Sequence, residues 1–144
     1  MKKFIIGFLT IIFLTGCSET THNNYKFMGE SDHWEAVYSY KGTEKWGKKD
    51  GVITYSSEDT DEFILEYKGS VEELSSLQNL EYSYEAFGRS SKRTEEFTEP
   101  LTTKVFTNSG SSKGAAKVSE DEVIKVTVKW DDSEETILLE NHNK

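Results

Sequence analysis

Apolar and polar residues alternate along much of the sequence, and this period of two constrains the fold more than any other feature. Trp34, Ala36, Tyr38 and Tyr40 occupy every second position of the first clear example. Successive side chains of a strand point to opposite faces, so the pattern predicts strands with one buried face. The same alternation recurs in three later segments, residues 63–68, 80–87 and 124–130.

Turn signals separate these segments. Lys49-Asp50-Gly51 predicts a tight hairpin turn, because Asp-Gly suits the positive φ angles of such turns, and Val52–Tyr55 is expected to return as a strand. The acidic runs 58–62 and 131–135 are also interpreted as turns, the second one leading into a strand over 136–139. We interpret 88–93 and 108–113 as polar loops, with short strands around Phe97 and Val105-Phe106.

One segment has a helical period instead. Val71, Leu74 and Leu77 share one face at helical spacing, and Ser70 with Glu73 matches a capping box. We therefore predict a single short helix of about two turns near residues 71–78.

About eight short strands at near-regular spacing predict an all-β domain. The expected architecture is an antiparallel β-sandwich, immunoglobulin-like in arrangement, with a small closed barrel as the alternative. The Cys-Trp-Cys signature of immunoglobulin domains is missing, because Cys17 is the only cysteine in the sequence.

The N-terminus reads as an export signal. Lys2 and Lys3 precede an apolar run over residues 4–14, which is too short for a membrane span of about 20 residues and fits a secretory signal peptide. The run ends in Leu14-Thr15-Gly16-Cys17, which resembles the lipobox of bacterial lipoproteins. The resemblance implies cleavage after Gly16 and a diacylglyceryl group, with fatty chains such as palmitate, on the Cys17 sulfur.

This resemblance sets the expected domain organisation and location. We expect a lipoprotein signal peptide over 1–16, a flexible lipid-anchored tether over 17–27, a β-sandwich domain over 28–141 and a tail over 142–144. The mature protein would be held on the extracytoplasmic face of the cell membrane. Two acyl chains suffice for stable anchoring, so the domain would need no membrane-binding surface of its own.

Charge and cysteine content exclude several functions. Cleavage removes 16 of the 144 residues and two of the 17 basic residues, which leaves 128 residues and 15 basic against 26 acidic side chains, a net charge of −11. Such an acidic domain repels phosphate backbones, so we expect no nucleic-acid partner. A single cysteine allows no internal disulfide and no cysteine-based zinc site.

Several stretches of the mature chain also share a family resemblance. Residues 29–34, 69–71, 80–85 and 121–130 resemble small uncharacterised lipoproteins of Gram-positive, Firmicute-type bacteria. The resemblance covers most of the mature chain. It implies class and location, and it brings no activity with it.

Catalytic motifs are scarce. His22 lies in the expected tether and His142 in the tail, so His33 is the one histidine near the domain, and the sequence has no nucleophile elbow or His-Glu-x-x-His motif. We therefore predict no enzyme, no cofactor and no metal site. Two alternatives remain open, an envelope enzyme using paired carboxylates on glycans and a Ca²⁺ binder built on the acidic turns.

Aromatic residues supply the candidate binding site. Tyr82 and Tyr84 share a strand face, and Trp46 lies in a polar stretch beside lysines. Such rings could stack on a sugar or a peptide, although core packing is the expected role of the tyrosines. The predicted function is a lipid-anchored binding or interaction module whose partner is an envelope protein, a peptide or a wall glycan.

Overall fold

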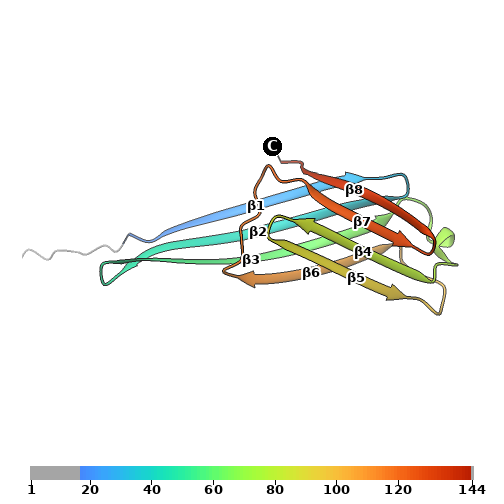
Figure 1. Cartoon of the computed structure of the whole chain (residues 1–144), viewed down its shortest axis with the longest axis horizontal. Helices are drawn as coiled ribbons and strands as arrows, with labels where there is room; N and C mark the ends of the chain where they lie inside the picture. Colours follow the sequence, from blue (N-terminus) through green and yellow to red (C-terminus); the bar gives the residue numbers. More distant parts are fainter. Residues whose placement is uncertain (1–16, 144) are drawn as a thin grey trace, which may run out of the picture.

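Eight antiparallel strands form a single curled sheet in a computed structural model that describes residues 17–143 (Figure 1). The order of strands across the sheet is β5-β4-β7-β8-β1-β2-β3-β6. The strands are β1 (Glu19–Glu30), β2 (Trp34–Lys49), β3 (Val52–Tyr67), β4 (Asn79–Ala86), β5 (Arg89–Glu96), β6 (Val105–Lys113), β7 (Ile124–Trp130) and β8 (Ser133–Asn141). The expected signal peptide lies outside the described residues.

The all-β antiparallel class is confirmed, whereas the two-sheet immunoglobulin-like sandwich is not. A short ladder between β1 and β8, with pairs Phe27↔Asn141 and Met28↔Glu140, joins the two halves into one sheet that curls as a half-barrel. The edge strands β5 and β6 have no backbone ladder between them in the described chain, so the barrel is not closed. Alternation reports which face of a strand is buried and says nothing about how many sheets share that core.

The core fills the concave face of the curled sheet. Side chains at alternating positions of facing strands meet across it, with ring centroids 5.0 Å apart for Tyr38 and Tyr84 and 5.7 Å apart for Phe63 and Tyr82. The largest fully buried side chains are Trp34, Tyr38, Phe27, Phe63, Leu65, Leu80, Ile124, Ile137, Leu139, Val118, Val126 and Val128. Burial of this apolar area is the main stabilising contribution to the fold. The chain has one cysteine and so no internal disulfide adds to it.

Strands β2 and β3 are each 16 residues long and extend well beyond the core. We call residues 43–58 the projecting hairpin and the rest of the described sheet the head. The predicted turn at its end is confirmed, since Asp50 and Gly51 have φ angles of 52° and 80°. Figure 1 shows this turn and the start of β1 at the same end of the molecule, far from the loops at the other end of the head.

Four polar segments are strands where the sequence predicted turns, loops or a tether. The acidic run 58–62 lies in the middle of β3, loops 88–93 and 108–113 lie in β5 and β6, and most of the expected tether forms β1, paired with β2 from Glu19↔Trp46 to Glu30↔Glu35. In β5, β6 and the start of β1 the alternation is weak because these segments lie at a sheet edge or outside the core. In the acidic run of β3 the buried positions are occupied by Asp59 and Asp61, so the alternation is not one of apolar residues.

The expected two-turn helix is a single 3₁₀ turn, η1 (Val71–Leu74). Leu74 and Leu77 of the expected apolar face are buried, but Leu77 lies beyond the end of the 3₁₀ turn. The capping box was wrong as well: Ser70 makes no side-chain cap, and the Glu73 carboxylate accepts a hydrogen bond from the Tyr67 hydroxyl at 3.1 Å.

Candidate functional site

A cluster of charged side chains lies on the concave face where the core ends and the projecting hairpin begins. Asp59 and Asp61 come from β3, and Arg89 is the first residue of β5. Because the acidic run is a strand, alternation sends Asp59 and Asp61 to the concave side. Their side chains are 6% and 11% exposed, and that of Arg89 is 13% exposed, so the three charges are nearly buried.

Arg89 and Asp59 form a two-point ion pair. The Arg89 Nη1 and Nη2 atoms donate to the two Asp59 carboxylate oxygens at 3.2 and 2.8 Å. Nη2 also donates to the Ala116 carbonyl oxygen at 2.8 Å, and the Ser112 hydroxyl donates to Asp59 Oδ1 at 2.7 Å. The guanidinium lies 5.2 Å from the centroid of the Tyr40 ring, a cation–π distance.

Asp61 is held by two tyrosines. Its Oδ2 atom accepts hydrogen bonds from the hydroxyls of Tyr38 at 2.8 Å and Tyr84 at 3.2 Å, and lies 3.5 Å from Arg89 Nη1. Burial raises the pKa of Tyr38 far above its usual range, and the hydrogen bond to Asp61 adds to the shift. Burial and the Asp61 charge raise the pKa of Tyr84 to about 12, so both phenols remain neutral donors.

The ion pair stays charged over the physiological pH range. Hydrogen bonding to Asp59 is the largest cause that raises the pKa of Arg89, and it outweighs the opposing effect of burial. Burial alone would raise the pKa of Asp59, but hydrogen bonds from Arg89 and Ser112 together lower it below its ordinary value. Asp59 is therefore a fixed anion, and a general acid needs the opposite shift.

A polar hollow opens between the edge strands β5 and β6 next to this cluster. Its volume is about 360 Å³, and the Asn108 amide donates to the Ser91 hydroxyl across it at 3.0 Å. Gly110 faces the cluster so closely that a Cβ atom there would lie 2.9 Å from Asp61 Oδ1. Hydroxyl and amide groups dominate the lining of this hollow: Ser90, Ser91, Asn108, Ser109, Ser111 and Ser112.

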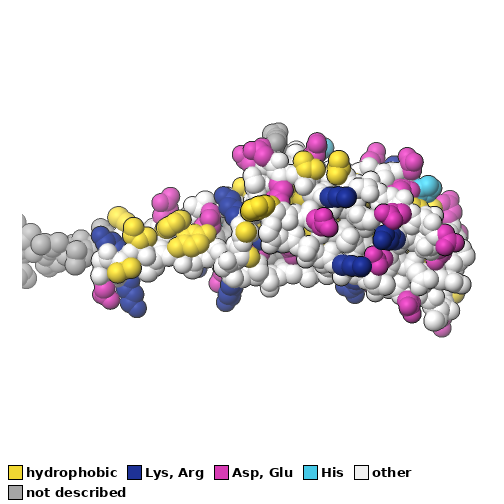
Figure 2. All heavy atoms as spheres, in the orientation of Figure 1, with side chains coloured by type: hydrophobic (Ala, Val, Ile, Leu, Met, Phe, Trp, Pro, Cys, Tyr) yellow, Lys and Arg dark blue, Asp and Glu magenta, His cyan; other side chains and the backbone are white. Residues whose placement is uncertain are grey.

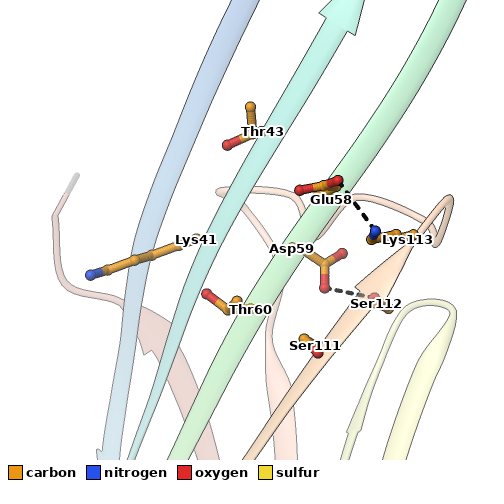
Figure 3. Close-up of a pocket in the computed structure, with 8 residues that line it drawn as sticks. All are labelled: Lys41, Thr43, Glu58, Asp59, Thr60, Ser111, Ser112 and Lys113. Carbon is orange, nitrogen blue, oxygen red and sulfur yellow. Dashed lines mark hydrogen bonds and ion pairs between the residues drawn. The ribbon is translucent and has the colours of Figure 1, made fainter.

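A second hollow, of about 400 Å³, lies alongside β3 and β6 and is drawn in Figure 3. Asp59, Ser111 and Ser112 line both hollows. Figure 3 shows Asp59 pointing to Ser112 and Glu58 pointing to Lys113, whose Nζ lies 3.7 Å from a Glu58 carboxylate oxygen. The strand register pairs Asp59 with Ser112 and Thr60 with Ser111, and neighbouring positions of a strand point to opposite faces. The two hollows therefore flank β6 on opposite faces of the sheet, and we call them together the β6 cleft.

Another polar group lies at the far end of the head. Glu135 accepts hydrogen bonds from the Ser31 hydroxyl at 2.6 Å and the His33 backbone nitrogen at 2.9 Å, and its Oε2 lies 2.6 Å from His33 Nδ1. Burial opposes these bonds, but together they lower the pKa of Glu135 below its ordinary value. Ser31 bonds to the carboxylate and not to the imidazole, so nothing here activates its hydroxyl as a nucleophile.

Two of the acidic residues in 131–135, Asp131 and Glu135, are bonded within the fold. Asp131 Oδ1 accepts from the backbone nitrogens of Gln78 and Asn79 at 3.2 and 3.0 Å, and Glu135 ties down the β1–β2 turn. Within residues 17–143, no group of three or more His, Cys, Asp or Glu side chains is placed to hold a metal ion.

The predicted aromatic site does not form as one surface. Tyr82 and Tyr84 are buried in the core, 2% and 8% exposed, so their rings are not open to a surface ligand. Trp46 is 46% exposed and lies on the projecting hairpin, where its ring centroid is 4.4 Å from that of Tyr55. The core packing expected for the tyrosines is what the structure shows.

Sequence reasoning missed the Arg89 cluster because it interpreted both contributing segments as turn or loop. One signal was present: Asp59 and Asp61 continue the odd-numbered series of Phe63, Leu65 and Tyr67 on the buried face of β3. A polar residue at a position that alternation assigns to the core indicates a buried polar network.

Cys17, the expected site of lipid attachment, is exposed at the start of the described chain, two residues before β1. No helix in the described residues is both long enough and apolar enough to cross a bilayer. Compared with known protein families, with curated protein sequences and with solved structures, the chain matches none of them.

Proposed function

We propose that the protein is a lipid-anchored binding module on the extracytoplasmic face of the cell membrane, attached through Cys17, whose β6 cleft binds a glycan of the cell wall. The placement of Cys17 carries the proposal. An exposed cysteine at the end of an elongated molecule allows the lipid to enter a membrane while the head stays free.

The strand lengths support this arrangement. Seven residues in each strand of the projecting hairpin, 43–49 and 52–58, correspond to roughly 23 Å at the rise of a β-strand. The head therefore stands away from the lipid attachment point, and the β6 cleft lies at the junction, on the side of the head that faces the envelope layers nearest the membrane.

The lining of the cleft favours a glycan as the ligand. Hydroxyl and amide side chains both donate and accept hydrogen bonds, which matches the hydroxyl groups of a sugar chain. The buried charge beside them is already paired, because Asp59 bonds to Arg89 and Ser112. A charged ligand group that engaged Asp59 or Arg89 would have to break these bonds, whereas a neutral polyhydroxyl ligand need not. An envelope protein or a peptide is the competing partner.

Binding is favoured over hydrolysis at this site. A paired-carboxylate glycosidase needs one carboxyl group that remains protonated until it donates its proton. Asp59 has the opposite property, since its pKa is lowered by Arg89 and Ser112 against the effect of burial. A sugar held here would meet a stable anion and not an acid catalyst.

Acylation is tested on protein recovered from the membrane of the expressing bacterium. Its mass should equal that of a chain beginning at Cys17 with a diacylglyceryl group, and Cys17→Ala should abolish the lipid and release the protein from the membrane fraction. A chain of unprocessed mass, bound equally in both versions, would contradict the anchor.

Glycan binding is tested separately with wall sacculi stripped of anionic polymers. Wild-type protein should co-sediment with them, and Ser111→Arg, which fills the hollow of Figure 3, should reduce the bound fraction. Thr107→Arg is the matched control, because Thr107 is an exposed residue of the same strand outside the lining of both hollows. Equal binding by both variants and the wild type would overturn the cleft as the site, and no binding at all would favour a protein partner.

A further inference from the structure

We propose that the tip of the projecting hairpin, residues 45–55, is a membrane-contacting surface that lies in the headgroup region of an anionic bilayer beside the lipid on Cys17. The inference deepens the proposed function and rests on it for the lipid anchor. It also revises the expectation that the domain needs no membrane surface of its own.

Large apolar side chains are concentrated at this tip. Ile53 is 73% exposed, Val52 65%, Tyr55 48% and Trp46 46%, and these four belong to nine exposed large apolar residues in the described chain. Figure 2 shows yellow side chains along the projecting hairpin, with dark blue ones among them. Beyond Trp46 β1 no longer pairs with β2, so the end of the hairpin is two-stranded, and a two-stranded hairpin alone is only marginally stable in water.

The chemistry of the tip matches a membrane interface. Trp and Tyr are enriched at the headgroup level of bilayers, and basic side chains are attracted to anionic lipids. The tip holds three lysines, Lys45, Lys48 and Lys49, against a single acidic residue, Asp50, in a chain whose net charge is −9. Repulsion between the acidic head and an anionic bilayer is weak across the length of the projecting hairpin, since the Debye length at physiological salt is about 8 Å.

The strand register places the tip beside the expected lipid. Glu19 of β1 pairs with Trp46 of β2, and Lys48 pairs with Ile53 of β3. Continuing the β1 register by two residues puts Cys17 opposite Lys48, so a lipid on Cys17 would enter the membrane next to Ile53. Acyl chains reach the hydrocarbon only if their attachment point lies at the headgroups, which brings the tip there too.

A bilayer fits the tip better than a second copy of the chain. Edge-to-edge pairing of two tips would bring two sets of three lysines together, and lysines on exposed strands discourage such pairing. An anionic lipid surface turns the same lysines into an attractive contact.

The test uses the chain from Cys17 onward, which contains all eight strands and the described core. Its one thiol is coupled to maleimide-headgroup lipid in vesicles of phosphatidylcholine and phosphatidylglycerol, so anchoring does not depend on acylation in the cell. Trp46 emission is isolated by subtracting the spectrum of Trp46→Phe. We expect it to shift to shorter wavelength and to lose most of its intensity when the vesicles contain brominated phospholipid.

Two charge-introducing variants sharpen the result. Ile53→Asp should abolish both the shift and the quenching, whereas Leu138→Asp, at a 59% exposed apolar position on β8 of the head, should leave them unchanged. Folding of each variant is checked by its circular dichroism spectrum. Replacing phosphatidylglycerol by phosphatidylcholine should weaken the quenching, because it removes the anionic charge that attracts the lysines.

The possible outcomes separate the two proposals. Unquenched Trp46 on coupled vesicles overturns the membrane contact and leaves acylation of Cys17 untouched. Quenching on coupled vesicles upholds the contact even if protein from cells proves unacylated. A blue shift without vesicles that rises with protein concentration would show that a second copy covers the tip, and would overturn the proposal.

Discussion

The two ends of strand β3 have opposite surroundings. In the head, Phe63 is 1% exposed and its ring lies 5.2 Å from that of Tyr84 on a facing strand. In the projecting hairpin, Tyr55 is 48% exposed and its one aromatic neighbour in the described chain is Trp46, on the adjacent strand. The same continuous strand therefore derives its stability from a core at one end and from a single neighbouring strand at the other.

The border between the two regions is polar. On the concave face, Asp59 and Asp61 occupy the two positions of β3 between Phe63 and the projecting hairpin. Arg89 of β5 forms ion pairs with both. Just beyond this border Lys117 Nζ lies 3.7 Å from a Glu44 carboxylate oxygen, and farther along the hairpin the side chains of Tyr55 and Ile53 are exposed. Burying an ion pair costs desolvation energy. Here the ion pair lies where the edge strands β5 and β6 do not pair with each other.

The largest expected effect compares two aromatic truncations on β3. Phe63→Ala should lower the free energy of unfolding by about 3–5 kcal/mol, because it leaves a cavity in the core. Tyr55→Ala should cost about 1 kcal/mol, the order of one aromatic pair. Urea unfolding followed by circular dichroism measures both. Equal losses would show that the projecting hairpin is part of the cooperative core.

The second comparison concerns the border itself. Arg89→Met leaves Asp59 and Asp61 buried without their cation, and should destabilise the protein by about 3–5 kcal/mol. The control is Arg93→Met on the same strand, whose partner Glu95 is within reach but whose side chain is 48% exposed, so its loss should cost about 1 kcal/mol or less. A small effect for Arg89→Met would mean that water reaches the carboxylates.

Two glycines give a third comparison. A Cβ atom at Gly29 would lie 2.3 Å from the Leu138 carbonyl oxygen, at the seam where β1 meets β8. Gly29→Ala should therefore cost about 3 kcal/mol, because backbone must move. Gly51, at the hairpin turn, has open space but a φ angle of 80°, so Gly51→Ala should cost about 1 kcal/mol. Thermal unfolding of the pair tests whether the seam holds the two halves together.

The smallest effect is the dependence of stability on pH. The pKa values of Asp59 and Glu135 are lowered by folding, so the stability they provide is present above the pKa of an unfolded carboxyl, about 4, and is lost as pH falls through the lower folded values. Asp59→Asn and Glu135→Gln should each flatten the acid limb of the stability curve. Unfolding free energies measured from neutral to acidic pH check this, and an unchanged slope in both variants would contradict it.

Strong alternation predicted part of the fold well. The strands around Trp34–Tyr40, 80–86 and 124–130 and the Asp50-Gly51 turn are confirmed, because one buried face imposes a clear period of two. Polar segments that became β1, β5 and β6 could not be predicted, since their pairing depends on neighbouring strands that are distant in sequence. The β1–β8 ladder that joins the two halves of the sheet is equally non-local.

The candidate site was less predictable than the fold. Trp46 is exposed on the projecting hairpin, and its role in binding stays a prediction. Arg89, Asp59 and Asp61 come together only through strand contacts 30 and 28 residues apart along the chain. The hydroxyl lining of the β6 cleft looked like a flexible loop in sequence, because serine and glycine have low strand preference. Neither the partner strands nor the hollow between them leaves a local signature.

Intact mass measurement of the protein extracted from its native membrane tests the central claim most directly. The account predicts a chain that starts at Cys17 and carries the added mass of a diacylglyceryl group on that residue, with no free thiol. A chain that retains residues 1–16 and a free Cys17 thiol would contradict it, because the head, the projecting hairpin and the membrane would then have no fixed relation.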